Sequence, residues 1–339
     1  MNRAMVSKTY RKLIATRLSN DFRSAIAITE LPIPTPAPHE IVIRNHYAGI
    51  NAGFDTLLCR GKVPYTHLTP PFDLGVEAVG EVVAIGQDVH TLQIGDAVAT
   101  TIRGGGYREY QAISENLALQ IRDATTEILT LMPTGISALV ALEKVGEMTS
   151  GEVVLVTAAA GGVGHIAVQL AKLARNHVIG VCGSDAKVAL LRNLGCNRII
   201  NYRTETLDTV LQQEYPNGID LVFDCVGKQV FDTCVDHLAI RGRLIIIGFI
   251  SEYTNDLECV TQPRIYQKLF WKSASVRGFL MPHFSEYAVE GRDRLLDLFY
   301  ADKLKVAVDS TAFCGIESIP DAVEHLLSGK NCGKVVVKF

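Results

Sequence analysis

Six apolar runs rich in valine, isoleucine and leucine lie between residues 152 and 280, and they constrain the fold more than any other feature. The runs are EVVLVTA (152–158), HVIGVCG (177–183), NRIINY (197–202), DLVFDCVG (220–227), RLIIIGFI (243–250) and ASVRGFL (274–280). Stretches with a helical pattern separate most of them. A strand that is apolar along its whole length is buried on both faces, as in a parallel sheet covered by helices. The pattern therefore predicts an α/β domain with a doubly wound, Rossmann-type parallel sheet.

The part of the chain before residue 130 has a different pattern. Residues 10–20 and 24–30 are predicted to be short strands, and the prolines of LPIPTPAPHE then indicate an extended surface connection. EIVIRNHYAGIN (40–51) alternates like a half-buried strand, and short β-like runs punctuated by glycines continue from 75 to 112. A chain of 339 residues is long enough for about two domains. We therefore expect a second, β-rich domain.

A glycine-rich turn follows the first of the six runs, in LVTAAAGGVGHIAVQLAKLA (155–174). It matches G-x-G-x-x-G except that Ala159 replaces the first glycine. A strand, such a turn and a helix N-terminus together form a dinucleotide-binding unit, in which the backbone approaches the pyrophosphate and the helix packs on the strand. The expected cofactor-binding residues of this turn are Ala160, Gly161, Gly162, Val163 and Gly164. A tight turn that binds nothing is the alternative.

The end of the second run indicates which dinucleotide is bound. An NAD site needs an acidic residue there to bind the ribose hydroxyls. This sequence instead has Gly183 and Ser184, and Asp185 comes late enough that we expect it to cap the next helix. Lys187 and Tyr202 supply a cation and a hydroxyl that suit a 2′-phosphate, so NADPH is the expected cofactor. For Lys187, a solvated helix lysine is the alternative.

Composition and charge exclude several other classes of protein. A net charge of -3 gives no basic surface for nucleic acid. We expect no membrane span, because we identify no apolar run that approaches the required length of about 20 residues. The eight cysteines form no C-x-x-C pair, as is typical of reduced thiols. The stretch MNRAMVSKTYRKL lacks the apolar core of a secretory signal, and KVVVKF is not a peroxisomal address. The expected location is cytoplasmic, with peroxisome or mitochondrion as alternatives.

GVEAVGEVVAIGQDVHTLQIGDAV (75–98) fits the signature segment of the medium-chain dehydrogenase/reductase superfamily along its whole length. This resemblance implies a GroES-like catalytic domain over 1–132 and 309–339, with a Rossmann NADPH-binding domain over 133–308 inserted in it. Further segments, among them KLIATRLSNDFR, QEYPNGIDLVFDCVG and GRLIIIGFISEY, resemble the branch that contains quinone oxidoreductases and prostaglandin reductases.

Zinc, which many members of this family use, is not expected here. Zinc-dependent members have a histidine where this chain has Val76, and the cysteine that precedes the signature segment is absent from GINAGFD. The lobe with four closely spaced cysteines is also missing. Since catalytic Zn²⁺ needs about three protein ligands, the sequence predicts an enzyme without a metal site.

The resemblance also implies roles for individual residues. Tyr253, in the loop FISEY, would donate to the carbonyl oxygen of a substrate on which negative charge develops. Asn51 would hold the nicotinamide ribose or the substrate carbonyl, and Tyr65 would line the substrate entrance. Structural roles are the alternatives for Tyr253 and Asn51. The residues that resemble positions lining nicotinamide are Ser137, Val226, Gly227, Phe249, Ile250 and Ser251. Asn331 and Gly333 resemble the C-terminal loop that reaches toward the adenine-ribose phosphate.

The activity implied by the resemblance is NADPH-dependent reduction of the carbon–carbon double bond of α,β-unsaturated ketones, including 15-oxo-prostaglandins and other lipid enones. A reductase of small quinones or alkenals is the alternative within the same class. A regulatory or structural protein that binds NADPH without turnover is the alternative from another class. The stretch SASVRGFLM resembles an edge strand that pairs with its copy, so we expect a homodimer.

Overall fold

A computed structural model describes residues 8–339 and divides them into two compact units. Unit 1 comprises the described residues up to Met132 together with Val308–Asn331 and Val335–Phe339. Unit 2 comprises Pro133–Ala307 and a short loop, Cys332–Lys334. The expectation about a secretory signal falls largely on residues 1–7, which lie outside the described residues.

Unit 2 is built on a parallel sheet of six strands in the order β11-β10-β9-β12-β13-β14. The strands are β9 (Val153–Val156), β10 (His177–Cys182), β11 (Arg198–Asn201), β12 (Ile219–Asp224), β13 (Leu238–Ile246) and β14 (Ser275–Gly278). Each of the six apolar runs overlaps one of them, although β12 and β13 begin one and five residues before their runs, so the predicted Rossmann-type sheet is confirmed. The strands form because their side chains are buried on both faces, as at Leu155 and Val222, which are fully buried.

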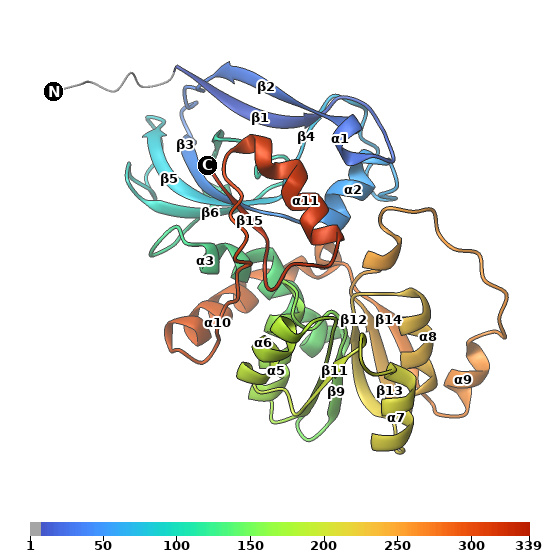
Figure 1. Cartoon of the computed structure of the whole chain (residues 1–339). Coiled ribbons are helices and arrows are strands. Elements are labelled where there is room, and N and C mark those ends of the chain that lie inside the picture. Colours follow the sequence, from blue (N-terminus) through green and yellow to red (C-terminus); the bar gives the residue numbers. More distant parts are fainter. Residues whose placement is uncertain (1–7) are drawn as a thin grey trace. The chain divides into compact units, whose positions relative to one another are not determined.

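Helices connect the strands and cover both faces of this sheet (Figure 1). The helices of unit 2 are α4 (Ile136–Val140), α5 (Gly164–Leu173), α6 (Asp185–Asn193), α7 (Leu207–Glu214), α8 (Lys228–Asp236), α9 (Tyr266–Phe270) and α10 (Ala288–Tyr300). Helix α5 is buried along most of its length, from Gly164 to Ala171. A helix this deeply buried places its first turn rigidly against the strand that precedes it.

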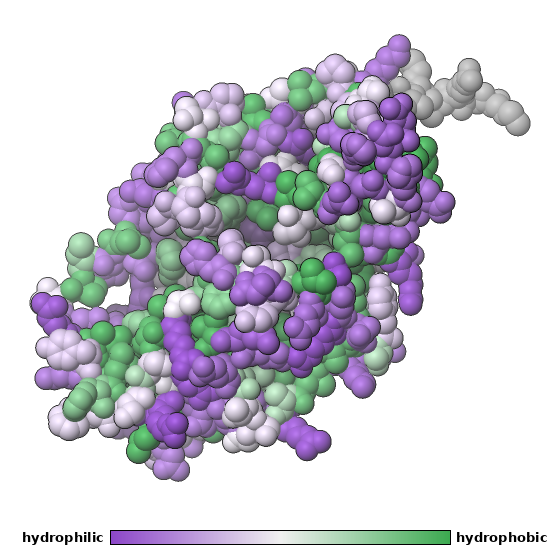
Figure 2. Space-filling view, turned by 180° about the vertical axis from the view of Figure 1, so that it is seen from behind, coloured by the Kyte–Doolittle hydropathy of each residue, from purple (hydrophilic) through white to green (hydrophobic). Residues whose placement is uncertain are grey.

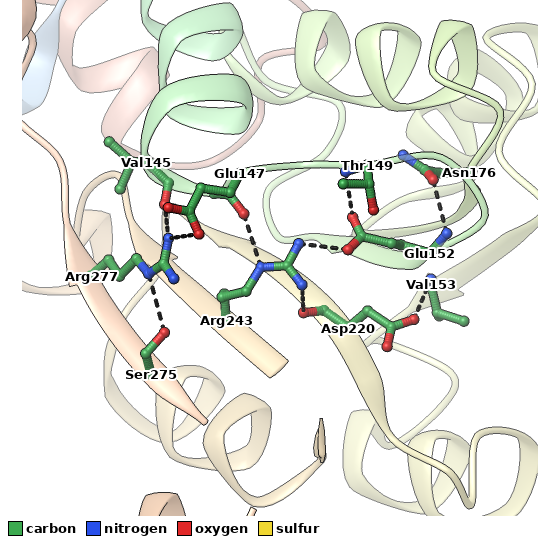
Figure 3. A network of polar contacts seen from close by, with 11 residues as sticks. Val145, Glu147, Thr149, Glu152, Val153, Asn176, Asp220, Arg243, Ser275 and Arg277 are labelled. Atoms are coloured by element: carbon green, nitrogen blue, oxygen red, sulfur yellow. Dashed lines mark hydrogen bonds and ion pairs between the residues drawn. The ribbon is translucent and has the colours of Figure 1, made fainter. Parts of the chain in front are cut away.

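A network of arginines ties the strands together at their amino-terminal edge (Figure 3). Arg243 on β13 donates to the Gly146 carbonyl (2.9 Å), the Asp220 carbonyl (3.2 Å) and the Glu152 carboxylate (2.7 Å). Both charged side chains are largely buried, with 14% and 13% exposed. Arg277 on β14 donates in the same way to the Val145 carbonyl at 2.6 Å. These arginines make their contacts at the edge where the strands begin, opposite the edge where the strands end.

Unit 1 contains two sheets with antiparallel pairing. The larger has the order β15-β3-β5-β6-β8, with β7 also paired to β3. Its strands are β3 (Glu40–Gly49), β5 (Glu77–Ile85), β6 (Ala97–Thr101), β7 (Tyr110–Ser114), β8 (Ala118–Gln120) and β15 (Val336–Lys338). The smaller has the order β2-β1-β4, from β1 (Thr9–Ala15), β2 (Ile26–Pro32) and β4 (Phe72–Asp73). The β-rich first domain is thus confirmed.

The helices of unit 1 are α1 (Phe22–Ala25), α2 (Ala52–Cys59), α3 (Thr126–Thr130) and α11 (Ile319–Leu327). The predicted strand over residues 10–20 is shorter than expected: β1 ends at Ala15, and Asp21 then caps α1 by accepting a hydrogen bond from the Ser24 N–H. The predicted strand over 24–30 accordingly begins at Ile26. Local capping chemistry overrides the apolar pattern at this point.

One helical run, Thr126–Val145, is long and apolar enough to cross a membrane, contrary to the expectation from the sequence. The run is not a regular helix, because the backbone at Met132 has non-helical angles (φ -64°, ψ -105°). Its most apolar stretch is 72% buried, as in the core helix of a globular domain. On the face of the molecule shown in Figure 2, hydrophilic and hydrophobic residues are interspersed.

Candidate cofactor and active site

Most of the predicted cofactor residues of unit 2 lie where its parallel strands end. The glycine-rich turn follows β9, Ser184 follows β10, Tyr202 follows β11, Gly227 follows β12 and Phe249 follows β13. The strand order reverses between β9 and β12. In open α/β sheets of this kind, ligands bind outside the carboxyl ends of the strands at that reversal. The topology thus brings residues from five separate loops to one edge.

The glycine-rich turn connects β9 tightly to α5. A Cβ atom at Gly164 would lie 2.5 Å from the Ala158 carbonyl oxygen, so only glycine permits this packing of helix on strand. Ala158, rather than the alanine at the first motif position, adopts the left-handed conformation (φ 46°). A Cβ at Gly161 would meet the same Ala158 oxygen at 3.2 Å and no other atom within 4 Å. The turn therefore leaves open space at Gly161, where backbone N–H groups can contact a phosphate.

Lys334 lies against this turn, and nothing in the sequence singled it out except its place after Gly333. Its side chain is buried, and its Nζ donates to Thr134 Oγ1 at 3.1 Å. A Cβ at Gly162 would lie 3.2 Å from Lys334 Cδ. A buried lysine beside a glycine-rich turn adds positive charge to the place where a helix N-terminus already favours an anion.

The residues predicted to bind a 2′-phosphate come together at the ends of β10 and β11. A Cβ at Gly183 would lie 2.2 Å from the Tyr202 hydroxyl, so this hydroxyl lies against the backbone just before Ser184. Ser184, not Asp185, is the N-cap of α6, and its Oγ accepts from the Lys187 N–H. The expectation that Asp185 caps the helix is therefore wrong: Asp185 is the first helical residue and accepts from Asn201 Nδ2.

A buried carboxylate, which the sequence analysis did not single out, shapes the turn after β12. Asp224 accepts hydrogen bonds from Thr157 Oγ1 (2.7 Å), the Val226 N–H (3.0 Å) and the Gly227 N–H (3.1 Å). Gly227 adopts a left-handed conformation (φ 79°). Burial raises the pKa of Asp224, while these three donors act in the opposite direction. The signal in the sequence is an acidic residue that directly follows the apolar stretch Leu221–Phe223 at the end of the strand.

The loop after β13 folds back on the Val226–Gly227 turn. Ser251 Oγ donates to the Val226 carbonyl at 2.6 Å, and the Ile250 N–H donates to the Cys225 carbonyl at 3.1 Å. The two loops thus bring together five predicted nicotinamide contacts: Val226, Gly227, Phe249, Ile250 and Ser251.

Tyr253 is held within this loop. Its hydroxyl oxygen accepts from the Phe249 N–H at 3.1 Å, and the two rings pack with centroids 4.9 Å apart. Burial raises the pKa of the Tyr253 phenol, so it stays protonated at neutral pH. A neutral phenol retains a proton that it can donate to an oxyanion.

Three further predicted cofactor residues lie outside these five loops. Ser137 is partly exposed on α4. Gly333, in the short loop of unit 2, donates its N–H to the Ala160 carbonyl at 2.7 Å and pairs with Gly161 as an isolated parallel bridge. Asn331 is buried and is the last residue of unit 1 before that loop.

The remaining predicted catalytic residues, Asn51 and Tyr65, belong to unit 1. Asn51 precedes α2, and its Nδ2 donates to the buried Glu77 carboxylate at 2.7 Å. Tyr65 is 49% exposed, and burial of the remainder raises the pKa of its phenol. Asn51 thus has a fixed orientation set by an acidic residue of the signature segment, whereas Tyr65 lies at the surface.

Among residues 8–339, no group of three or more histidine, cysteine, aspartate or glutamate side chains is placed to hold a metal ion. Val76 occupies the position next to Glu77 where zinc-dependent members have a histidine.

Two family descriptions match the chain: "Zinc-binding dehydrogenase" over residues 162–298 and "Alcohol dehydrogenase GroES-like domain" over residues 37–123. Mouse prostaglandin reductase-3 is 42% identical over 98% of this chain and 90% of its own. A probable quinone oxidoreductase of Leishmania amazonensis is 38% identical over 97% of this chain and 98% of its own.

The similarity extends to solved structures. The crystal structure of CurA from Vibrio vulnificus in complex with NADPH superposes with a TM-score of 0.85 at 25% identity, covering 97% of this chain and 98% of that one. The chain therefore belongs to the medium-chain dehydrogenase/reductase family of oxidoreductases. Within that family, the expected resemblance to the branch of quinone oxidoreductases and prostaglandin reductases is confirmed, with prostaglandin reductase 3 of mouse and cattle both 42% identical.

Proposed function

We propose that the chain catalyses NADPH-dependent reduction of the carbon–carbon double bond of α,β-unsaturated ketones, with lipid enones such as 15-oxo-prostaglandins as the substrate class. The observation that carries this proposal is the gathering of predicted cofactor residues from five loops at the strand reversal of the unit 2 sheet. The names of the relatives, prostaglandin reductase-3 and quinone oxidoreductase, support a reductase.

The residues present fit a phosphorylated dinucleotide. The open space at Gly161 and the first turn of α5 suit the pyrophosphate. The Tyr202 hydroxyl lies against Gly183, and together with Ser184 and Lys187 it provides donors and a cation for a 2′-phosphate. An NAD site requires a carboxylate at this place, but the chain has Gly183 and Ser184 there. The CurA structure in complex with NADPH supports the same choice.

When bound, NADPH would supply a hydride to the β-carbon of the enone. Negative charge then develops on the carbonyl oxygen of the substrate, and we assign its stabilisation to the Tyr253 phenol, which burial keeps protonated. Asn51, oriented by Glu77, would bind the nicotinamide ribose or the substrate carbonyl. Tyr65 would contact substrate at the entrance. The proton at the α-carbon would come from solvent, so positioning and charge stabilisation would account for the rate.

We infer that the reaction needs no zinc. The chain has Val76 beside Glu77, and valine provides no atom that ligates a metal. Dialysis against a strong chelator, followed by metal analysis, should leave turnover unchanged; a loss of activity that added Zn²⁺ restores would contradict this.

A second candidate function is reduction of small quinones or alkenals, which the name of the Leishmania amazonensis relative favours. The two candidates differ in how kcat/KM depends on chain length. An enone reductase for lipids should prefer 15-oxo-prostaglandin E2 to a short alkenone, whereas an enzyme for small substrates should show the opposite order. A protein without turnover should bind NADPH and reduce nothing in a broad panel.

Replacement of Tyr253 by phenylalanine tests the catalytic assignment. Loss of an oxyanion donor should lower kcat by about 10²-fold, with the Kd for NADPH unchanged. Tyr215→Phe is the matched control, because it removes a hydroxyl that contacts His177 at the opposite end of β10. Equal activity of Tyr253→Phe and the wild type would leave Tyr253 with a structural role only.

We further propose a homodimer formed through β14. This strand is at the edge of the sheet and is paired only with β13 among the strands described. Light scattering coupled to gel filtration should give twice the mass of one chain; a monomer at micromolar concentration would refute the proposal.

A further inference from the structure

Helix α5 presents two buried polar side chains to the backbone of residues 305–307. Gln169 Oε1 accepts from the Lys305 N–H at 2.8 Å, and its Nε2 donates to the Lys305 carbonyl at the same distance. One turn earlier, His165 Nε2 accepts from the Ala307 N–H at 3.1 Å. Residues four apart lie on one face of a helix. One face of α5 thus holds the backbone of this segment at Lys305 and at Ala307.

The hydrogen bonds of His165 define a single tautomer. Its Nδ1 lies 2.8 Å from the Gly161 carbonyl oxygen, which can only accept, so Nδ1 carries the proton. Nε2 is then without a proton and accepts from Ala307. The side chain is fully buried, and this burial lowers the pKa of His165 to about 4, which keeps the imidazole neutral at pH 7. Only a neutral imidazole can make both contacts at once.

The two backbone segments that His165 joins, the glycine-rich turn and Ala307, each form a hydrogen bond to the loop Cys332–Lys334. On one side, the Gly333 N–H donates to the carbonyl of Ala160, next to Gly161, at 2.7 Å. On the other side, the Lys334 N–H donates to the Ala307 carbonyl at 2.9 Å. Gly333 adopts φ 91°, and a Cβ there would lie 2.3 Å from the Ala307 oxygen. The loop therefore lies between the glycine-rich turn and Ala307, with little space to shift.

We propose that His165 is a positioning residue for the cofactor: its imidazole connects the Gly161 carbonyl to the Ala307 N–H and so sets the spacing between the glycine-rich turn and the loop that carries Gly333. This inference rests on the proposed function, because it takes the turn and the loop to be two walls of the NADPH site. His165 contacts neither substrate nor cofactor in this role, and it acts through the two backbone segments that it joins.

Three substitutions separate the two contacts of His165. Asn places an amide near the position of Nδ1 and keeps the contact to Gly161, whereas Gln places an oxygen near the position of Nε2 and keeps the contact to Ala307. Ala removes both. His177→Ala is the matched control, because His177 is exposed at the start of β10 and contacts Tyr215. Each full-length variant is titrated with NADPH by calorimetry, and KM and kcat are measured where turnover is found.

His165→Ala should raise the Kd for NADPH about tenfold, which corresponds to about 1.4 kcal/mol. His165→Asn and His165→Gln each keep one of the two contacts, so their Kd should lie between those of the wild type and His165→Ala, and His177→Ala should not change it. KM for NADPH should follow Kd, while kcat at saturating NADPH stays the same. A wild-type Kd in His165→Ala, or full rescue by either Asn or Gln alone, would overturn the inference.

Hydrogen exchange of the protein without cofactor distinguishes failure of this inference from failure of the proposed function. The amides of Ala307, Gly333 and Lys334 should exchange faster in His165→Ala than in His165→Gln. If the wild type binds no NADPH, the proposed function fails, and the exchange measurement still decides whether His165 holds the loop. Unchanged exchange at these amides in His165→Ala would show that it does not.

Discussion

Substitution of Asp224 by asparagine removes the buried negative charge that organises the turn after β12. In the wild type, one carboxylate oxygen accepts from Thr157 Oγ1 and the Val226 N–H, and the other accepts from the Gly227 N–H. An asparagine can retain the first pair of contacts through its oxygen. Its NH₂ group then faces the Gly227 N–H, so that two donors oppose each other in a site from which water is excluded.

The size of the effect follows from these contacts. An unsatisfied buried N–H costs about 1–3 kcal/mol, and the two remaining bonds lose the strength that a charged acceptor gives. The lower desolvation cost of a neutral amide offsets part of this loss. We therefore expect a net destabilisation of about 2 kcal/mol, which lowers Tm by about 4–8 °C in a domain of 150–250 residues. Since Val226 and Gly227 are predicted nicotinamide contacts, KM for NADPH should rise as well.

Urea unfolding, calorimetry and steady-state kinetics on Asp224→Asn measure these changes directly. Asp208→Asn is the control, because Asp208 is exposed and pairs with His237 at the surface, where an ion pair contributes about 0–1 kcal/mol. If Asp224→Asn matched the wild type in both Tm and KM, the Asp224 carboxylate would not hold this turn and the reasoning would be refuted.

Three other changes have defined outcomes. Gly183→Ala should displace the Tyr202 hydroxyl, which lies 2.2 Å from the new Cβ, and lower the preference for NADPH over NADH about tenfold; Gly278→Ala, with open space around its Cβ, should leave that preference unchanged, and an equal effect of both would contradict the assigned site. Arg243→Ala should cost about 3 kcal/mol in urea unfolding, because it leaves Glu152 without its buried partner, whereas Arg294→Ala at a surface pair should cost under about 1 kcal/mol. The pKa of His165 is about 4 in the folded protein and about 6.5 in the unfolded chain, so its contribution to the free energy of unfolding is complete above about pH 6.5. About 3 kcal/mol of that free energy is lost as the pH falls toward 4. Urea unfolding of His165→Gln should show a smaller loss over that window, and parallel pH profiles of the two proteins would refute this.

The sequence was most informative where burial is uniform. Each of the six strands of unit 2 overlaps an apolar run, since a strand covered on both faces is mostly apolar. The first strands of unit 1 were less well placed. β1 ends at Ala15, and Asp21 then caps the short helix α1 before β2 begins, which the β-like pattern of residues 10–30 did not indicate.

The candidate site was predicted as a set of loops, because motifs mark the turns that follow strands. The sequence indicated Gly161 and Gly164 through the need for close approach and close packing, and Gly227 through the family resemblance. It did not indicate Asp224 or His165, whose roles depend on partners 67 and 142 residues away in the chain. A long-range contact of this kind leaves no periodic pattern, so only the folded chain reveals it.

Transfer of deuterium from NADPH labelled at the hydride-donating carbon tests the central proposal most directly. The labelled cofactor is incubated with 15-oxo-prostaglandin E2 and with a short alkenone, and the products are analysed by mass spectrometry and NMR. We expect a saturated ketone with deuterium at the β-carbon, hydrogen from solvent at the α-carbon and an intact carbonyl group. An allylic alcohol, or a substrate recovered without deuterium while NADPH binds, would contradict the proposed reaction.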